Sequence, residues 1–207
     1  MRKQMGFTLV EIAVVLVIIG LLLGGVLKGQ ELITQAKIRN VAKDFDGLTA
    51  AIYSYQDRYR GLPGDDGGAK TRWSLTNGGN GDGLIDGKYN SATDNDESRL
   101  FWLELRKAGF IGGDTDSLEQ PLNAANGKLG VQNGALGLVG PVVCSANLPA
   151  KIAIGVDTQL DDGKGKTGSV RAIKQPSGTA NSDVAASDSP SDYVETGSDL
   201  FVVCKVI

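Results

Sequence analysis

The sequence begins with an apolar run that is long enough to cross a lipid bilayer. Between Phe7 and Leu27 the only formally charged side chain is Glu11. A membrane-spanning helix needs about 20 apolar residues, and its backbone polar groups must all be bonded internally. A carboxylate inside such a run costs roughly 2.5–3.5 kcal/mol on insertion scales. We therefore interpret residues 7–27 as a transmembrane helix and Glu11 as a functional residue that requires a partner.

The residues on either side of this run predict its orientation. Arg2 and Lys3 precede it, and basic residues favour the cytoplasmic side of a membrane. No small-x-small cleavage site follows the run before Lys28, which argues against a removable secretory signal. We expect a single-pass protein with a cytoplasmic N-terminus and the rest of the chain outside. An uncleaved signal anchor with a stray acid is the alternative.

The segment from Gly6 to Glu11 reads Gly-Phe-Thr-Leu-Val-Glu, between a short basic leader and the apolar run. It resembles the N-terminus of type IV pilins and type II secretion pseudopilins, over roughly the first 27 residues. The resemblance implies that a prepilin peptidase removes residues 1–6 by cutting between Gly6 and Phe7. It also implies N-methylation of the new amine of Phe7 and a role for Glu11 in assembly.

Charge neutralisation explains how these two residues could act together. Cleavage leaves a positive amine on Phe7, and in a packed helical bundle the Glu11 carboxylate of one subunit can neutralise the amine of its neighbour. Two unfavourable buried charges then become one pair. We therefore expect a filament of identical subunits or related pilins, built at an inner-membrane assembly platform.

Residues 28–60 contain no proline and continue the helix with an amphipathic pattern. Apolar residues at spacings of three and four form one stripe that should pack against a head domain. The stripe consists of Ile38, Val41, Phe45, Leu48, Ile52, Tyr55 and Tyr59. We predict an α+β, type IV pilin-like fold, in which a long helical spine packs on a small antiparallel sheet with short helices. The head spans residues 61–207 and lies in the periplasm or outside the cell.

Local signals predict the elements of this head. Gly61 and Pro63 end the long helix. Periodicity and turn residues then predict a helix at 94–108, a hairpin of strands 127–131 and 135–139 around Asn133-Gly134, a helix at 149–160, and strands at 169–174 and 200–206. Buried positions expected in the first of these helices are Leu100, Phe101, Trp102, Leu103 and Leu105.

Residues 175–198 are rich in Ser, Asp, Ala and Pro and have almost nothing to bury. This composition predicts a mobile, exposed loop. Such a loop is a candidate surface for adhesion or O-glycosylation, and a plain solvated loop is the alternative.

Two cysteines, Cys144 and Cys204, lie in the exported part of the chain. An oxidising periplasm favours a disulfide between them. Closing a loop of about 60 residues contributes roughly 4 kcal/mol in the chain-entropy model. The resemblance to type IV pilins, many of which close their C-terminal segment with one disulfide, points the same way. Two free buried thiols are the alternative.

Part of a calcium-binding loop is recognisable in residues 77–86. Asn80, Asp82 and Asp86 occupy positions of an EF-hand-like pattern and are candidate calcium ligands. Gly78 at the first ligand position and Tyr89 at the twelfth exclude a full EF-hand. The resemblance to major pseudopilins, which bind calcium in this general region, favours such a site, and a turn rich in Gly and Asn is the alternative. We expect no required cofactor.

The composition argues against an enzyme and against nucleic-acid binding. The chain has no histidine, so Ser-His-Asp and Cys-His arrangements cannot form. A net charge of -3 and the absence of a Lys/Arg stripe give no nucleic-acid footprint, although a local patch could still form. We predict a structural subunit of a type IV pilus, either a major or a minor pilin, held in the inner membrane before assembly and in the cell-surface pilus afterwards. The alternatives are a type II secretion pseudopilin and a tip adhesin-type minor pilin.

Overall fold

The computed structural model describes residues 8–195 and 197–207, and its first element is the long helix α1, Leu9–Tyr59. The predicted helix over residues 7–60 is confirmed within the described residues. Arg60 has φ of 59°, the left-handed conformation that closes many helices, and Pro63 follows shortly afterwards. The helix therefore ends where the backbone turns left-handed.

The chain divides into two units, residues 1–36 and residues 37–207. Within the first unit, the described part of α1 exposes its apolar side chains, such as Leu9 (86% exposed) and Leu16 (63%). An 18-residue window of this helix has a mean hydropathy of 2.8 and no buried residue. By length and composition, α1 can cross a membrane.

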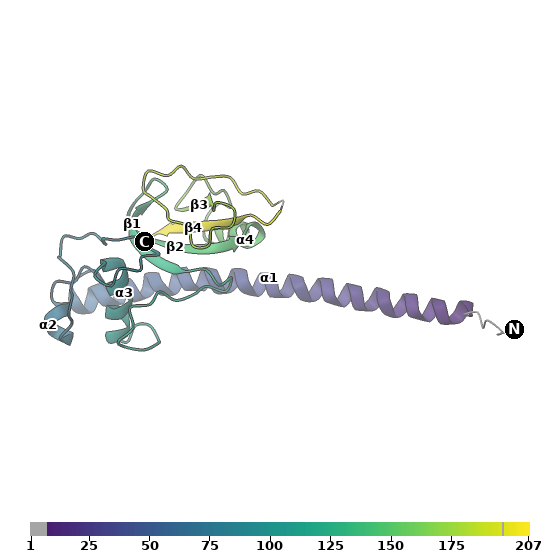
Figure 1. The fold of residues 1–207 in the computed structure, drawn as a ribbon, viewed down its shortest axis with the longest axis horizontal. Coiled ribbons are helices and arrows are strands. Elements are labelled where there is room, and N and C mark those ends of the chain that lie inside the picture. Colours follow the sequence, from purple (N-terminus) through teal and green to yellow (C-terminus); the bar gives the residue numbers. More distant parts are fainter. Residues whose placement is uncertain (1–7, 196) are drawn as a thin grey trace. The chain divides into compact units, whose positions relative to one another are not determined.

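The second unit contains a four-stranded antiparallel sheet in the order β1-β2-β4-β3 (Figure 1). Its strands are β1 Leu129–Ala135, β2 Leu138–Pro149, β3 Val170–Lys174 and β4 Leu200–Val206. Three short helices accompany it: α2 Ala69–Trp73, α3 Glu97–Lys107 and α4 Ala150–Leu160. The predicted helices at 94–108 and 149–160 and the last two strands are confirmed, while α2 was not predicted.

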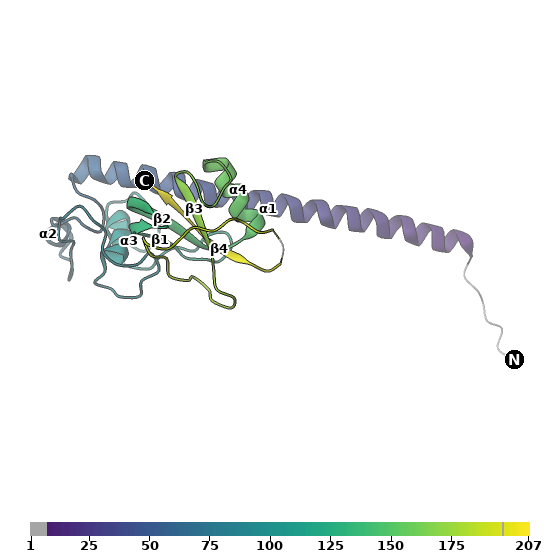
Figure 2. The same cartoon turned by 90° about the horizontal axis from the view of Figure 1, so that it is seen from above.

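The main core lies between one face of the sheet and the part of α1 that belongs to the second unit (Figure 2). Phe45 and Tyr55 of α1 pack in the same cluster as Val131, Phe201 and Val203 of the sheet. Six of the seven residues of the predicted stripe are buried, and Tyr59 is half-buried. All five apolar positions predicted for α3 are buried as well. The amphipathic pattern therefore identified the surface on which the head is built.

Part of the segment 175–195, which the sequence predicts to bury almost nothing, lies on the opposite face of the sheet. Val142, Cys144 and Val202 point to this face, where they cluster with the buried Val184 of the segment. The segment is also attached through its backbone, since Ala185 O accepts a bond of 3.0 Å from the N–H of Leu136. In its described residues the segment contains no helix or strand and is mostly exposed, with only Gln175 and Val184 buried, so the predicted exposed loop is confirmed. Its mobility stays a prediction. Composition did not reveal the main-chain hydrogen bonds that attach the loop to the sheet.

The turn of the first hairpin also differs from the prediction. The strands are joined at Leu136 and Gly137, whose φ values of 53° and 75° fit the left-handed turn that hairpins favour. The predicted turn, Asn133-Gly134, is instead a bulge inside β1. The buried amide of Gln132 donates to Gly134 O at 2.6 Å and so helps to hold the bulge in place.

Both outer strands of the sheet, β1 and β3, make backbone hydrogen bonds to other segments of the chain on the edge that faces away from the sheet. On β1, the N–H of Asn133 donates to Ile85 O at 3.2 Å. On β3, the N–H of Ala172 donates to Gly165 O at 2.8 Å, and Ala172 O accepts from Ser191 N at the same distance. Covered edges of this kind resist pairing with strands of other molecules.

Candidate functional site

Glu11 lies in the first turn of α1, where it forms a capping box with Thr8. Its Oε2 accepts the backbone N–H of Thr8 at 2.8 Å and the Thr8 hydroxyl at 2.7 Å. Thr8 Oγ1 in turn accepts the N–H of Glu11 at 3.3 Å. Thr or Ser at the cap with Glu three residues later satisfies N–H groups that a helix start leaves without partners. The Thr-x-x-Glu spacing was visible in the sequence, but our prediction did not use it.

The capping box leaves part of the Glu11 carboxylate available. Both bonds from Thr8 go to Oε2, and within residues 8–195 and 197–207 the structure gives Oε1 no donor. The side chain is exposed and sits among exposed apolar neighbours such as Val10 and Ile12. In an apolar medium, one bare carboxylate oxygen favours the approach of a hydrogen-bonding cation. Gly6 and Phe7, the predicted processing residues, lie outside the described residues.

Cys144 and Cys204 form the predicted disulfide. They occupy directly opposed positions on β2 and β4, with Cα atoms 4.0 Å apart and both side chains fully buried. The bridge therefore joins two central strands of the sheet and ties the C-terminal strand to the head.

The loop predicted as a candidate calcium site is organised around two buried carboxylates from outside it. Asp65 accepts the N–H groups of residues 81, 82 and 83 at 2.6–3.1 Å. Glu97 accepts the N–H groups of Asn80 and Asp86 at 2.9 Å each. Burial raises the pKa of Glu97, while these two N–H bonds oppose the increase. Asp65 and Glu97 thus hold the loop by accepting hydrogen bonds from its backbone. No motif in the sequence predicted this role.

The candidate calcium ligands themselves lie on the exposed side of this loop. Asn80 and Asp82 are brought together, since Asn80 Nδ2 donates to Asp82 Oδ2 at 3.2 Å. Asp82 and Asp86 are exposed, and the structure gives no bond between their side chains. Their carboxylates fit the oxygen chemistry that calcium prefers. Calcium binding at Asn80, Asp82 and Asp86 stays a prediction.

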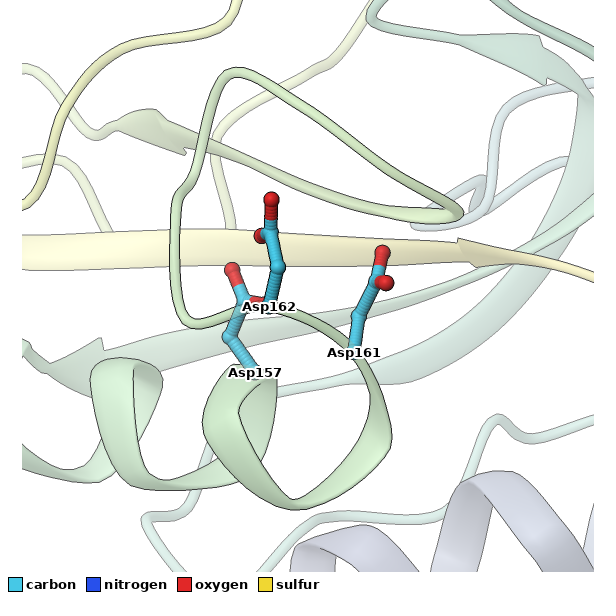
Figure 3. A group of neighbouring side chains, drawn as sticks. All are labelled: Asp157, Asp161 and Asp162. Atoms are coloured by element: carbon cyan, nitrogen blue, oxygen red, sulfur yellow. The ribbon is translucent and has the colours of Figure 1, made fainter.

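A group of three acids lies at the end of α4, with Asp157 inside the helix and Asp161 and Asp162 just after it, and one oxygen from each lies within 4.8 Å of the others (Figure 3). Each carboxylate already has a donor from the protein. Asp157 accepts the Tyr193 hydroxyl at 2.6 Å, and Asp162 accepts the Thr167 hydroxyl at 2.6 Å. Asp161 accepts two backbone N–H groups at the start of β3. Burial raises the pKa of Asp157, and the Thr167 bond lowers the pKa of Asp162. These acids fasten the connection between α4 and β3.

Comparison with known proteins identifies the first segment of the chain. Residues 1–27 match the prokaryotic N-terminal methylation motif. No curated protein and no solved structure has significant similarity to the chain. The motif implies processing by a prepilin peptidase and association with the membrane. The chain therefore carries the prepilin leader of type IV pilins and pseudopilins, ahead of a long apolar helix and a pilin-like α+β head.

Proposed function

We propose that the chain is a structural subunit of a type IV pilus, assembled by bundling of its N-terminal helices after prepilin peptidase cleavage. The observation that carries the proposal is the apolar, exposed start of α1 with Glu11 as its only charge between Phe7 and Leu27. An apolar surface of this size must be covered by lipid or by protein. Lipid covers it in the inner membrane, and other copies cover it in the filament.

The bare oxygen of Glu11 supports pairing with a neighbouring subunit. Removal of residues 1–6 would place the methylated amine of Phe7 one residue before the cap residue Thr8. The capping box directs Oε2 of Glu11 toward its own helix and leaves Oε1 for an amine from another copy. A charge-assisted bond of this kind is stronger in a low-dielectric bundle than in water.

The architecture of the head favours contacts through helices. Both free edges of its sheet are bonded within the chain, so strand addition is a poor route to a polymer. The disulfide-tied C-terminal strand favours a pilin over a pseudopilin, because pseudopilins more often lack this bridge.

The assembly mechanism is tested by Glu11→Ala and by the matched control Glu31→Ala, which removes a carboxylate from the same helix outside the apolar run. Leaving a buried charge without its partner costs about 3–5 kcal/mol. We therefore expect the Glu11 variant to remain in the membrane fraction while the yield of sheared filaments falls by more than about tenfold. The Glu31 variant should assemble normally. Normal filament yield from Glu11→Ala would refute the mechanism.

The alternative functions are separated by abundance. A major pilin should dominate sheared surface filaments, a tip adhesin should be scarce in them, and a pseudopilin should be absent. Mass spectrometry of sheared filaments reports presence, the mature N-terminus and the Cys144–Cys204 disulfide in one measurement. A peptide beginning with methylated Phe7 would support processing, and mature protein that still carries Met1 would contradict it.

A further inference from the structure

A single buried hydroxyl in the head lies between two carboxyl groups. The Tyr55 hydroxyl is 2.8 Å from Asp66 Oδ2 and 3.0 Å from Glu104 Oε2. Tyr55 and Glu104 are fully buried, and Asp66 is nearly so. A tyrosine hydroxyl has one proton to donate, so it can donate to only one of the two oxygens. The other contact requires a proton on one of the carboxyl groups.

Asp66 is the ionised member of the pair. Besides the Tyr55 hydroxyl, it accepts Arg72 Nη1 at 2.7 Å and the N–H of Gly68 at 2.8 Å. Burial opposes ionisation, but these three donors together lower the pKa of Asp66. Its negative charge is therefore matched by the Arg72 guanidinium.

Glu104 is the member that holds the proton. Its Oε2 accepts the N–H of Gly64 at 2.7 Å, and its Oε1 is buried without a partner among the described residues. In the ionised form this unpartnered oxygen would carry part of a buried negative charge, which costs more than an unpartnered oxygen of a neutral carboxyl group. Burial raises the pKa of Glu104 to about 8, and the bonds from Gly64 and Tyr55 only partly oppose this. The proton on Glu104 Oε2 then donates to Tyr55, and Tyr55 donates to Asp66.

We propose that Glu104 keeps its proton at neutral pH, and that the chain Glu104–Tyr55–Asp66 is an alkaline-sensitive latch fastening residues 61–74 to α1 and α3. The ionisable groups around Glu104 are Tyr55 from α1, Asp66 from the segment itself and Arg72 from α2. The segment approaches α3 closely, since a Cβ at Gly64 would lie 2.4 Å from Glu97 O. When Glu104 loses its proton, two negatively charged carboxylates face the Tyr55 hydroxyl, which has only one proton to donate.

The direction of the pH effect follows from the raised pKa. Because the folded state holds the Glu104 proton more tightly than the unfolded state, its contribution to stability is fully present below the ordinary glutamate pKa of 4.5. That contribution falls as the pH rises and is lost above the folded-state pKa of about 8. The latch should therefore weaken progressively between about pH 4.5 and pH 8 and change little at higher pH.

The protonation state is tested on the full chain in detergent micelles, with ¹³C in the glutamate carboxyl groups. We expect the Glu104 signal, identified by its absence in Glu104→Gln, to titrate near pH 8. A Glu104 signal that titrates near 4.5 would overturn the proposal. If the Gln variant does not fold, sequential assignment of the wild-type signal gives the same answer.

The latch itself is tested by amide hydrogen exchange at pH 6 and pH 9, corrected for intrinsic exchange rates. In the wild type, protection of residues 61–74 should fall by about tenfold or more at the higher pH, since each pKa unit corresponds to a tenfold change. In Glu104→Gln the segment should exchange equally at both pH values. Unchanged protection of the wild-type segment, or an equal loss in Glu104→Gln, would contradict the latch.

Discussion

The two units of this chain differ in how completely each one buries its apolar side chains and pairs its polar groups. Residues 37–207 bury apolar side chains on both faces of a sheet, bond the outer strands of that sheet and close it with a disulfide. The described residues 8–27 do the opposite, since they present apolar side chains outward around a single acid, Glu11. The first pattern gives a stable fold, and the second gives a surface that needs other molecules.

This difference indicates where each property of the protein is encoded. Substitutions in the head should act on its free energy of unfolding, and substitutions in the apolar part of α1 should act on membrane insertion and assembly. The predictions below test that division, and each pairs a substitution with a control.

The largest effect on unfolding is expected from truncating a side chain in the head core. Phe45→Ala should lower the free energy of unfolding of the head by about 3–5 kcal/mol, because it leaves a cavity between α1 and the sheet. Leu16→Ala, at an exposed position of the same helix, should change it by less than about 0.5 kcal/mol. Denaturant titration in micelles measures both. If Leu16→Ala lowered the free energy of unfolding as much as Phe45→Ala does, the stability of the head would not be confined to the second unit.

The disulfide should contribute a similar or slightly smaller amount. Replacing Cys144 and Cys204 together by alanine should cost up to roughly 4 kcal/mol, because the unfolded chain gains the freedom of an open loop. Since the two residues are already opposed on paired strands, the folded sheet should keep its register. Unfolding of the oxidised and reduced wild type is the control. Loss of membrane insertion in the double variant would contradict a role confined to the head.

A smaller effect is expected at the start of α1. Thr8→Ala removes the capping box and should cost the first turn about 1 kcal/mol, so that its amides exchange faster and filament yield falls. Thr8→Ser keeps the hydroxyl and should retain most of the yield. Thr34→Ala is the matched control, because the Thr34 hydroxyl bonds only to the preceding turn of the same helix. Equal yields from Thr8→Ala and Thr34→Ala would show that the capping box has no part in assembly.

The smallest effect is expected from calcium. Asp65 already holds the loop through three N–H bonds, so chelation should lower the melting temperature of the head by less than about 2–4 °C. Calorimetry with excess calcium and with chelator measures the shift, and Asp82→Asn is the control. A large stabilisation by calcium that disappears in Asp82→Asn would establish the site and favour a pseudopilin.

Features that follow from side-chain periodicity were predictable from the sequence. The spacing of Phe45, Leu48 and Ile52 revealed the buried face of α1, and the apolar run revealed its membrane-spanning part. The last strand was predicted with its observed bounds, because a continuous apolar segment between polar turns leaves few alternatives.

Features that depend on long-range backbone bonds were not predictable. Leu136 adopts a left-handed conformation that its residue type does not suggest, so the hairpin turn was placed three residues too early. Backbone hydrogen bonds attach part of the loop 175–195 to the sheet, and such bonds cannot be read from amino-acid composition. Asp65 and Glu97 gain their role because folding brings a distant glycine-rich loop to them.

The hydrogen bonds on the outer edges of β1 and β3 affect what happens when copies of this protein are crowded together. A membrane that holds a reserve of subunits crowds their heads together, and crowded heads with open strands would seed cross-β aggregates. Here the outermost strands already donate backbone hydrogen bonds to other segments of their own chain. Edge-to-edge pairing between neighbouring heads is therefore disfavoured, however densely the protein is held in a membrane.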